Sequence, residues 1–440
     1  MESALEKRAM SKVSWRIIPF IMLLYFIAFL DRVNIGFAAI HMNEDIGLDP
    51  AIFGLGAGLF FIGYFLFEVP SNLALEKFGA RLWIARVMVT WGLISGAMAF
   101  VQGPHSFYLL RFLLGVAEAG FFPGIILYLS YWFPMKNRAV VTAFFMAAAP
   151  ISVALGSPVS GALLEMDGLF GLHGWQWMFL IEAGPALLLG IMVLFYMTDR
   201  PEKAKWLQAD EREWLSATMN AERAAKDKAG AKHSILKGMT DPRVLALSLV
   251  YFGTSAGLYT LGIWAPQVLH GFGLTSFQTG LVNAIPPIAS VIAMFFWSRH
   301  SDRTGERTWH VTLACTAAAI GLFFAGFAVS LVAVLLALVV VNCGVSSAKP
   351  PLWAMPTLSL SGSAAATGIA TINSIGNLGG FVGPYAIGLI KQSTGSFEYG
   401  LYFVGALLLI SALTTLVIAG TSARKSAAAM QAAEAEASHS

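Results

Sequence analysis

Long apolar runs, separated by short polar or Gly/Pro-rich breaks, extend along the sequence from residue 15 to residue 420. A helix that spans a membrane needs about 20 mostly apolar residues. The pattern predicts twelve such helices, and Ser330 is the only polar residue that separates the ninth from the tenth. The predicted spans are 15–40, 51–75, 82–101, 107–133, 139–164, 177–197, 243–270, 277–298, 309–328, 330–356, 364–390 and 397–420.

The composition excludes a water-soluble protein. Of the 440 residues, 57% are hydrophobic and only 12% are charged, whereas soluble domains have about 25% charged residues. Cys315 and Cys343 lie in apolar runs and lack metal-type spacing. We therefore predict an all-α polytopic membrane protein that is not an enzyme, holds no metal or cofactor, and binds no nucleic acid.

The basic residues predict the orientation in the membrane. An even number of spans places both termini on one side, and the loops of that side contain almost every Lys and Arg outside the spans. Lys391 is the one basic residue in the loops of the other side. Because basic loops stay in the cytoplasm, we expect both termini to be cytoplasmic. The sequence lacks Asn-x-Ser/Thr sites, which favours a bacterial inner membrane. We expect a monomeric, multi-pass protein there.

A hydrophilic loop at residues 199–242 divides the chain. We predict an N-terminal bundle at 1–198, a C-terminal bundle at 243–422 and a cytoplasmic tail at 423–440. Trp206, Leu207, Trp214 and Leu215 recur at helical spacing in the loop, as in a helix that lies on a membrane surface. A solvated linker is the simpler interpretation and the one we favour.

A repeat relates the two bundles. Glu76-Lys77-Phe-Gly79-Ala-Arg81 follows the second span, and Asp302-Arg303-Thr-Gly305-Glu-Arg307 follows the eighth, 226 residues later. Pro158 and Pro384 are also 226 residues apart. Two motifs in one register indicate duplicated six-helix halves, the arrangement of transporters that rock around a central site.

These motifs resemble a known family. The repeated loop is similar to the signature loop of the major facilitator superfamily, although Asn72 stands where a glycine is usual and Glu76 where an aspartate is usual. Over roughly Trp15 to Gly420 the chain resembles the anion:cation symporter family, which includes permeases for tartrate, phthalate, 4-hydroxyphenylacetate and sugar acids. The more specific motifs are Phe29-Leu-Asp-Arg-Val-Asn-Ile-Gly36, Phe67-Glu-Val-Pro-Ser-Asn72, Arg111-Phe-Leu-Leu-Gly-Val-Ala-Glu118, Gly174-Trp-Gln-Trp-Met-Phe179 and Thr371-Ile-Asn-Ser-Ile-Gly-Asn377. The resemblance implies a major facilitator fold of two pseudo-symmetric six-helix bundles.

Seven ionisable residues fall within the predicted spans. Each costs about 3 kcal/mol or more at mid-bilayer depth, so each should face a cavity or a partner. Asp31 and Arg32 are about 100° apart on a helix and cannot point the same way, although a mutually neutralised local pair is the alternative. We interpret Glu68 and Glu182 as structural residues, with Glu68 a brace for the signature loop. The seven are Asp31, Arg32, Glu68, Arg111, Glu118, Glu182 and Lys349.

The family resemblance implies roles for several of these residues. It assigns proton coupling to Asp31 and Glu118, a modulating role to Arg111, and the substrate carboxylate to Arg32. Arg111 and Glu118 are two helical turns apart, which disfavours a direct ion pair between them. They can share a hydrogen-bond network with Asp31. A static ion pair between helices is the alternative. Uncharged residues that match substrate-contacting positions are Tyr64, Trp353 and Asn373, of which the two aromatics could equally be core residues.

Lys349 is the one basic residue within a span of the C-terminal half. We expect Pro350 and Pro351 to break its helix beside a cavity, where Lys349 would be a second carboxylate anchor. A lysine that extends to the membrane surface is the alternative.

The resemblance implies proton-coupled import of a small organic carboxylate by alternating access between the two bundles. Phe29 stands where the sugar-acid permeases have a tyrosine, and the segment near Ala147 to Pro150 has no glutamine. A dicarboxylate or an aromatic acid is therefore favoured over a sugar acid. The alternatives are an organic-anion antiporter or drug exporter of the same fold and, less favoured, a membrane sensor that does not transport.

Overall fold

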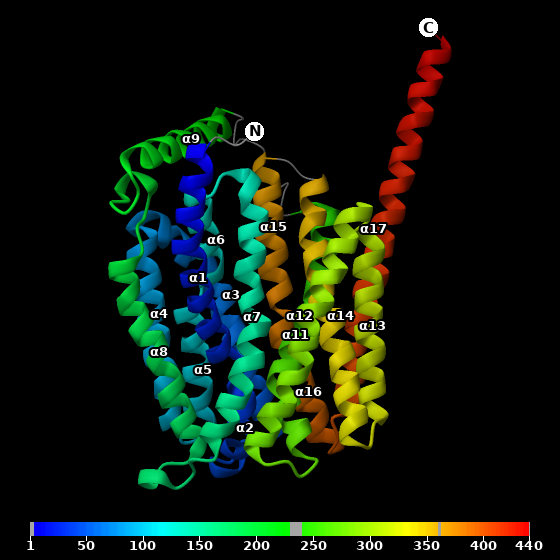
Figure 1. The fold of residues 1–440 in the computed structure, drawn as a ribbon. Helices are drawn as coiled ribbons and strands as arrows, with labels where there is room; N and C mark the ends of the chain where they lie inside the picture. The colour runs from blue at the N-terminus through cyan, green and yellow to red at the C-terminus, as the bar shows by residue number, and fades with distance from the viewer. Residues whose placement is uncertain (1–3, 229–239, 360–361, 440) are drawn as a thin grey trace.

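Two helical halves lie side by side in the computed structural model, which describes residues 4–228, 240–359 and 362–439. Both chain termini and the helix that follows the N-terminal half lie at one end of the molecule (Figure 1). We call this end the termini end and the other the opposite end. The arrangement agrees with the predicted all-α architecture of two bundles.

The N-terminal half contains α1 (Ala4–Val33), α2 (Ile35–Asp45), α3 (Pro50–Phe78), α4 (Ala80–Ala97), α5 (Pro104–Glu118), α6 (Phe121–Trp132), α7 (Met135–Leu164) and α8 (Gly174–Tyr196). After the connecting helix α9 (Ala209–Lys228), the C-terminal half contains α11 (Pro242–His270), α12 (Ser276–Thr304), α13 (Thr308–Phe327), α14 (Leu331–Ser359), α15 (Gly362–Asn377), α16 (Gly379–Thr394) and α17 (Glu398–His439).

Within the described ranges, eleven helical segments are long and apolar enough to cross a membrane. The remaining predicted span, 364–390, consists of α15 and α16, which meet at Leu378 and are each shorter than a full span. The predicted boundary at Ser330 is confirmed, because α13 ends at Phe327 and α14 begins at Leu331.

Two other predicted spans are also interrupted. The first breaks at Asn34, directly after the Asp31–Arg32 pair, and the fourth breaks at Ala119 and Gly120, directly after Glu118. Gly120 has a left-handed φ of 82°, which a glycine adopts without steric cost. The hydropathy pattern did not predict these interruptions, and they occur beside three of the buried charges.

In both duplicated loops a glycine with a positive φ ends the preceding helix. Gly79 ends α3 with a φ of 89°, and Gly305 ends α12 with a φ of 68°. A side chain at either position would be strained, which explains the glycine in both copies. The backbone N–H of Arg81 donates to Asp199 over 2.9 Å, and Arg307 forms an ion pair with Asp302 at 2.7 Å.

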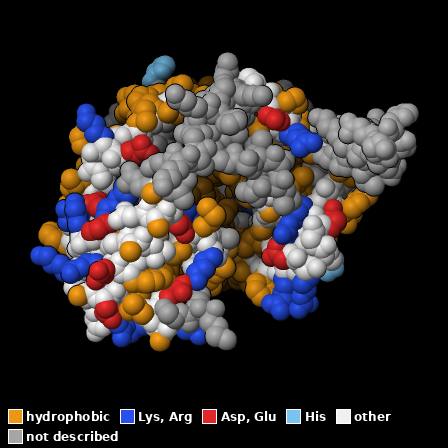
Figure 2. Space-filling model, turned by 90° about the horizontal axis from the view of Figure 1, so that it is seen from above, with side chains coloured by type: hydrophobic (Ala, Val, Ile, Leu, Met, Phe, Trp, Pro, Cys, Tyr) orange, Lys and Arg blue, Asp and Glu red, His pale blue; other side chains and the backbone are white. Residues whose placement is uncertain are grey.

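Backbone contacts join the halves toward the opposite end. A Cβ atom on Gly161 of α7 would lie 2.4 Å from the carbonyl oxygen of Ser276 at the start of α12. A Cβ on Gly388 of α16 would likewise lie 2.3 Å from the carbonyl oxygen of Pro50 at the start of α3. The pairs α7–α12 and α3–α16 are equivalent under the 226-residue repeat. At the termini end, by contrast, a hollow lies between the halves (Figure 2).

The connecting helix α9 docks on the N-terminal half. Glu211 accepts hydrogen bonds from Arg8 Nε at 2.8 Å and from Lys12 Nζ at 3.0 Å. Leu215 is fully buried, and the rings of Trp206 and Trp132 stack with centroids 5.3 Å apart. Although burial alone would raise it, these hydrogen bonds hold the pKa of Glu211 below its usual range. The prediction of a solvated linker is therefore wrong for this helix, because its apolar face packs on protein.

Replacement of Gly161 by alanine should push α7 and α12 apart, because the new Cβ atom meets backbone that cannot move alone. Overpacking of this kind costs about 1–3 kcal/mol, so we expect a lower melting temperature for the detergent-purified Gly161→Ala variant. Gly184→Ala is the control, because a Cβ on this glycine of α8 meets no atom within 4 Å. Equal melting temperatures for the two variants would contradict the close packing.

Candidate functional site

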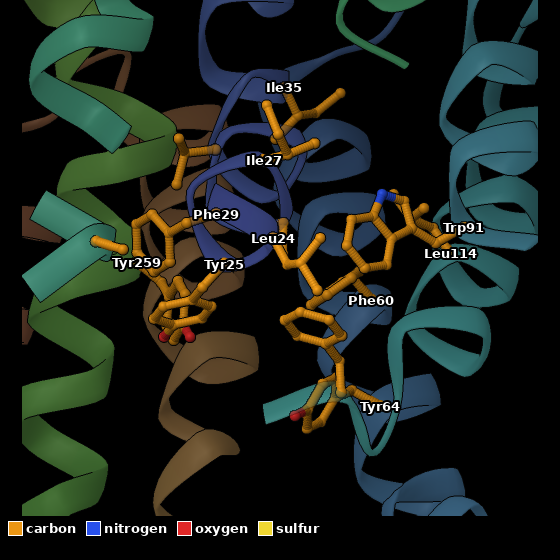
Figure 3. Packing of buried hydrophobic residues seen from close by; sticks show 14 of the residues in the cluster. Leu24, Tyr25, Ile27, Phe29, Ile35, Phe60, Tyr64, Trp91, Leu114 and Tyr259 are labelled. Atoms are coloured by element: carbon orange, nitrogen blue, oxygen red, sulfur yellow. The ribbon is translucent and has the colours of Figure 1, made fainter. Parts of the chain in front are cut away.

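Arg32 lies at the interface between the halves, near the end of α1. Its side chain is only 8% exposed. Nη1 donates to the hydroxyl of Tyr259 on α11 over 2.9 Å, and Nη2 forms an ion pair with Glu118 on α5. The rings of Phe60 and Tyr64 lie 5.3 and 5.4 Å from the guanidinium carbon. Figure 3 shows these two rings, together with Tyr259, among the buried residues of the core. Arg32 is thus a desolvated cation that contacts both halves and is surrounded by aromatic rings.

Asp31 points away from this interface. Its Oδ2 accepts from Trp91 Nε1 over 2.7 Å, and its Oδ1 accepts from Ser95 Oγ over 3.1 Å. Both donors belong to α4 of the same half. The predicted divergence of Asp31 and Arg32 is confirmed, and the alternative of a mutually neutralised local pair is wrong. Asp31 is a buried carboxylate held by two neutral donors.

Arg111 and Glu118 do not bond to each other within the described part of the chain. Glu118 is paired with Arg32, whereas Arg111 Nη2 donates to the carbonyl oxygen of Ala57 over 3.3 Å. The ring of Phe60 lies 5.2 Å from the Arg111 guanidinium and thus close to both cations. The expected absence of a direct Arg111–Glu118 bridge is thus seen here, and the carboxylate of Asp31 accepts its hydrogen bonds from α4.

Glu68 joins the two halves, which the sequence did not predict. Asn373 Nδ2 on α15 donates to its Oε1 over 2.6 Å, and Ser374 Oγ donates to its Oε2 over 3.3 Å. Glu68 lies one turn beyond Tyr64 along α3, on the side of Arg32 that faces the termini end. Its carboxylate therefore bridges the halves and does not brace the signature loop. No local pattern could have predicted this bridge, because the partners of Glu68 lie more than 300 residues away along the chain.

Glu182 remains within the N-terminal half. It accepts from Asn34 Nδ2 over 2.9 Å and from Ser160 Oγ over 2.6 Å. Because Asn34 is the residue at which the first span breaks, this carboxylate ties the break to α7 and α8. The geometry agrees with a structural role.

The remaining predicted residues lie in different surroundings. Lys349 is half-buried on α14, has no hydrogen-bond or ion-pair partner among the described residues, and is close enough to Arg32 for their charges to interact. The ring of Trp353 packs on Tyr251 of α11 with centroids 4.9 Å apart, as a core aromatic would. The predicted break at Pro350 and Pro351 is wrong, because α14 continues through both prolines to Ser359.

The family model of the Major Facilitator Superfamily matches residues 21–384. The chain belongs to this superfamily. It is 70% identical over 96% of its length to an Agrobacterium vitis protein named "Putative tartrate transporter", of which the match covers 97%. It is 43% identical over 94% of its length to the "Quinolone resistance transporter" of Acinetobacter baumannii, with 95% of that protein covered.

A solved structure has the same fold. A bacterial homologue of the human lysosomal transporter Spinster, in an inward-facing and occupied conformation, matches 92% of this chain and 96% of its own with a TM-score of 0.75. At 16% identity this likeness concerns the fold alone. The protein is thus a superfamily transporter and not an enzyme, and Arg32, Glu118 and Tyr259 occupy the interface between the halves of a major facilitator fold.

This site can exchange partners. A guanidinium presents several donors in a rigid fork that suits carboxylates, so a carboxylate from outside the chain can compete with Glu118 for Arg32. The described residues contain no cluster of three or more His, Cys, Asp or Glu side chains suited to a metal. The sequence did not predict the bonds between the halves that Tyr259 forms with Arg32 and Glu68 with α15, because the bonded residues are far apart along the chain.

Removal of the Glu118 carboxylate should strongly destabilise the protein, because Arg32 would be left as a buried charge without its counter-ion. A broken buried pair costs about 3–5 kcal/mol. We expect Glu118→Ala to melt well below Glu213→Ala, whose side chain is exposed on α9. Addition of Arg32→Leu to Glu118→Ala should restore most of the loss. Equal melting temperatures of the two single variants would show that the pair does not stabilise the fold.

Proposed function

We propose that this transporter imports a small dicarboxylate of the tartrate type together with protons. The observation on which the proposal depends is the position of Arg32, a buried cation at the interface that contacts one carboxylate of its own half and one hydroxyl of the other. A substrate carboxylate bound to Arg32 would lie between the halves, where alternating access needs it. The tartrate transporter named in Agrobacterium vitis supports the substrate class.

Both termini are proposed to be cytoplasmic. The loops of the termini end contain almost all Lys and Arg residues outside the spans, and basic loops remain in the cytoplasm. The end closed by the α7–α12 and α3–α16 contacts would then face the periplasm. The hollow at the termini end would lead toward the cytoplasm (Figure 2), and the bridge from Glu68 to Asn373 would lie between that hollow and Arg32.

Coupling follows from competition for Arg32. Glu118 as a carboxylate occupies Nη2 of Arg32, so a substrate carboxylate must displace it. A proton on Glu118 removes its negative charge and weakens its bond to Arg32, which leaves the fork for the substrate. Proton and substrate therefore favour each other's binding by the same free energy, as linkage requires. In this scheme Asp31 is a second proton acceptor, because its neutral partners on α4 can bond to either protonation state.

A second positive charge supports a substrate with two carboxylates. Arg32 belongs to the N-terminal half and Lys349 to the C-terminal half, and their charges interact across the interface. Lys349 has no anionic partner among the described residues, so it remains a half-buried cation unless an anion binds. A dicarboxylate could bind Arg32 with one group and Lys349 with the other, which would hold the halves together.

Export of a drug-like compound is the rival function. It is supported by the quinolone resistance transporter of Acinetobacter baumannii, which is less similar to this chain than the Agrobacterium vitis protein. Counterflow of radiolabelled tartrate into proteoliposomes, with and without an inward proton gradient, separates the two functions. Accumulation that requires the gradient supports import, whereas a failure of tartrate to exchange at all would sink the proposal.

In the same assay Asp31→Asn and Glu118→Gln should abolish accumulation driven by the proton gradient, because an amide cannot bind and release a proton. Exchange of internal for external tartrate should survive in at least one of them, since exchange need not release the proton. Glu213→Gln on the exposed face of α9 is the control and should accumulate tartrate normally. Normal accumulation by both Asp31→Asn and Glu118→Gln would remove these residues from the coupling mechanism.

Lys349→Gln should remove the preference for dicarboxylates, because it removes the cation proposed for the second carboxylate. We expect at least a tenfold weaker apparent affinity for tartrate, or about 1.4 kcal/mol, with little change for a monocarboxylate such as lactate. The matched control is Lys391→Gln, since this half-buried lysine contacts the ring of Phe397 near the opposite end. Equal losses for both substrates, or no loss, would show that Lys349 is not an anchor.

A further inference from the structure

A small cavity lies between the two halves beside the Arg32 site. It has a volume of about 30 Å³, and a buried water needs about 10–15 Å³. The space therefore suits one or two groups of the size of a water molecule or a hydroxyl, and it is too small for an aromatic ring. Its walls come from both halves: α1 and α7 on one side, and α11, α12 and α14 on the other.

The cavity lies close to Arg32. Phe29 lines it, and the Phe29 ring centroid lies 6.0 Å from the Arg32 guanidinium carbon. Val33 and Leu258 also line it; they are the direct neighbours in sequence of Arg32 and of its hydrogen-bond partner Tyr259. A substrate held by Arg32 thus needs only a short extension to reach the cavity.

Two amides stand out among the largely apolar walls, Asn283 of α12 and Asn342 of α14. Asn283 Nδ2 donates to Ser157 Oγ over 3.0 Å, and Asn342 Nδ2 donates to the carbonyl oxygen of Leu338 over 3.0 Å. These bonds fix both amides. Within the described part of the chain, neither Oδ1 atom accepts a hydrogen bond, although a polar atom at such an interface ordinarily has a partner.

Asn342 lies on the same helix as Lys349, the second cation of the proposed site. It lies seven residues before Lys349 on α14, or two helical turns, so the two residues occupy the same face. The C-terminal half therefore presents an amide and a lysine in one line, opposite Arg32 and Phe29 of the N-terminal half. The two cations suit the carboxylates of a ligand, and the amide suits a hydroxyl group on the same ligand.

We propose that the cavity is a hydroxyl-binding subsite, in which Asn342 and Asn283 accept hydrogen bonds from the hydroxyl groups of a hydroxylated dicarboxylate. The inference rests on the proposed function and refines it: Arg32 binds a carboxylate, and the two amides select substrates with hydroxyls on the carbons between the carboxylates. A dicarboxylate without hydroxyls leaves both acceptors unpaired. Sites built to bind a hydroxyl discriminate strongly against the analogue that lacks it, for this reason.

Calorimetric titration of the detergent-purified, full-length protein with tartrate and with succinate tests the subsite, because succinate has the same four-carbon chain without hydroxyls. We expect the wild type to bind tartrate at least tenfold more tightly than succinate. Asn342→Leu keeps a side chain of similar size but has no acceptor. It should weaken tartrate binding at least tenfold and change succinate binding less than twofold, so that the preference disappears.

Asn43→Leu is the matched control, because this half-buried asparagine of α2 does not line the cavity; it should keep the wild-type preference. If Asn342→Leu does not fold, Asn342→Ala tests the same acceptor and should lose the preference as well. An unchanged ratio of tartrate to succinate affinity, or equal losses for both acids, overturns the subsite but leaves proton-coupled dicarboxylate import intact. A wild type that binds neither acid overturns the proposed function and the subsite with it.

Discussion

A charge that lies within a membrane must have a partner, and Arg32 is where this constraint acts most strongly. The guanidinium is buried, and it obtains an ion pair from α5 and a hydrogen bond from α11. The interruptions after Arg32 and Glu118 bring these groups to the interface. Because the partners come from both halves, any movement of one half against the other must break or replace a bond of Arg32. A movement between the halves therefore changes the partners of this one buried cation.

The interface differs in kind along its length. Toward the opposite end, glycines let α7 approach α12, and α3 approach α16, to backbone contact. Toward the termini end, the bridge from Glu68 to Asn373 and Ser374 consists of side-chain hydrogen bonds. The close helix–helix contacts at the glycines separate or form as a unit. The Glu68 carboxylate, by contrast, can exchange Asn373 and Ser374 for water or for a ligand. The two ends can thus respond to different events during a transport cycle.

Local geometry made part of this structure predictable. The angle between adjacent helical residues predicted the divergence of Asp31 and Arg32. The 226-residue offset predicted two duplicated halves, and in both of them a glycine with a positive φ, Gly79 or Gly305, ends the helix before the repeated loop. The bonds of Glu68 were not predictable, because its partners lie on a distant helix whose register is set by packing. The docking of α9 was missed for a related reason: its charges resemble a solvated face until Arg8 and Lys12 are known to lie opposite them.

The docking of α9 has a consequence for the order in which the chain is made. During synthesis the N-terminal half and α9 leave the ribosome before α11, and domains generally fold as they emerge. Glu211 can therefore neutralise Arg8 and Lys12, and Trp206 can cover Trp132, while the second half does not yet exist. The first half would then already have α9 packed on α1 and α6 when the second half is made, so the two halves would assemble with this helix in place.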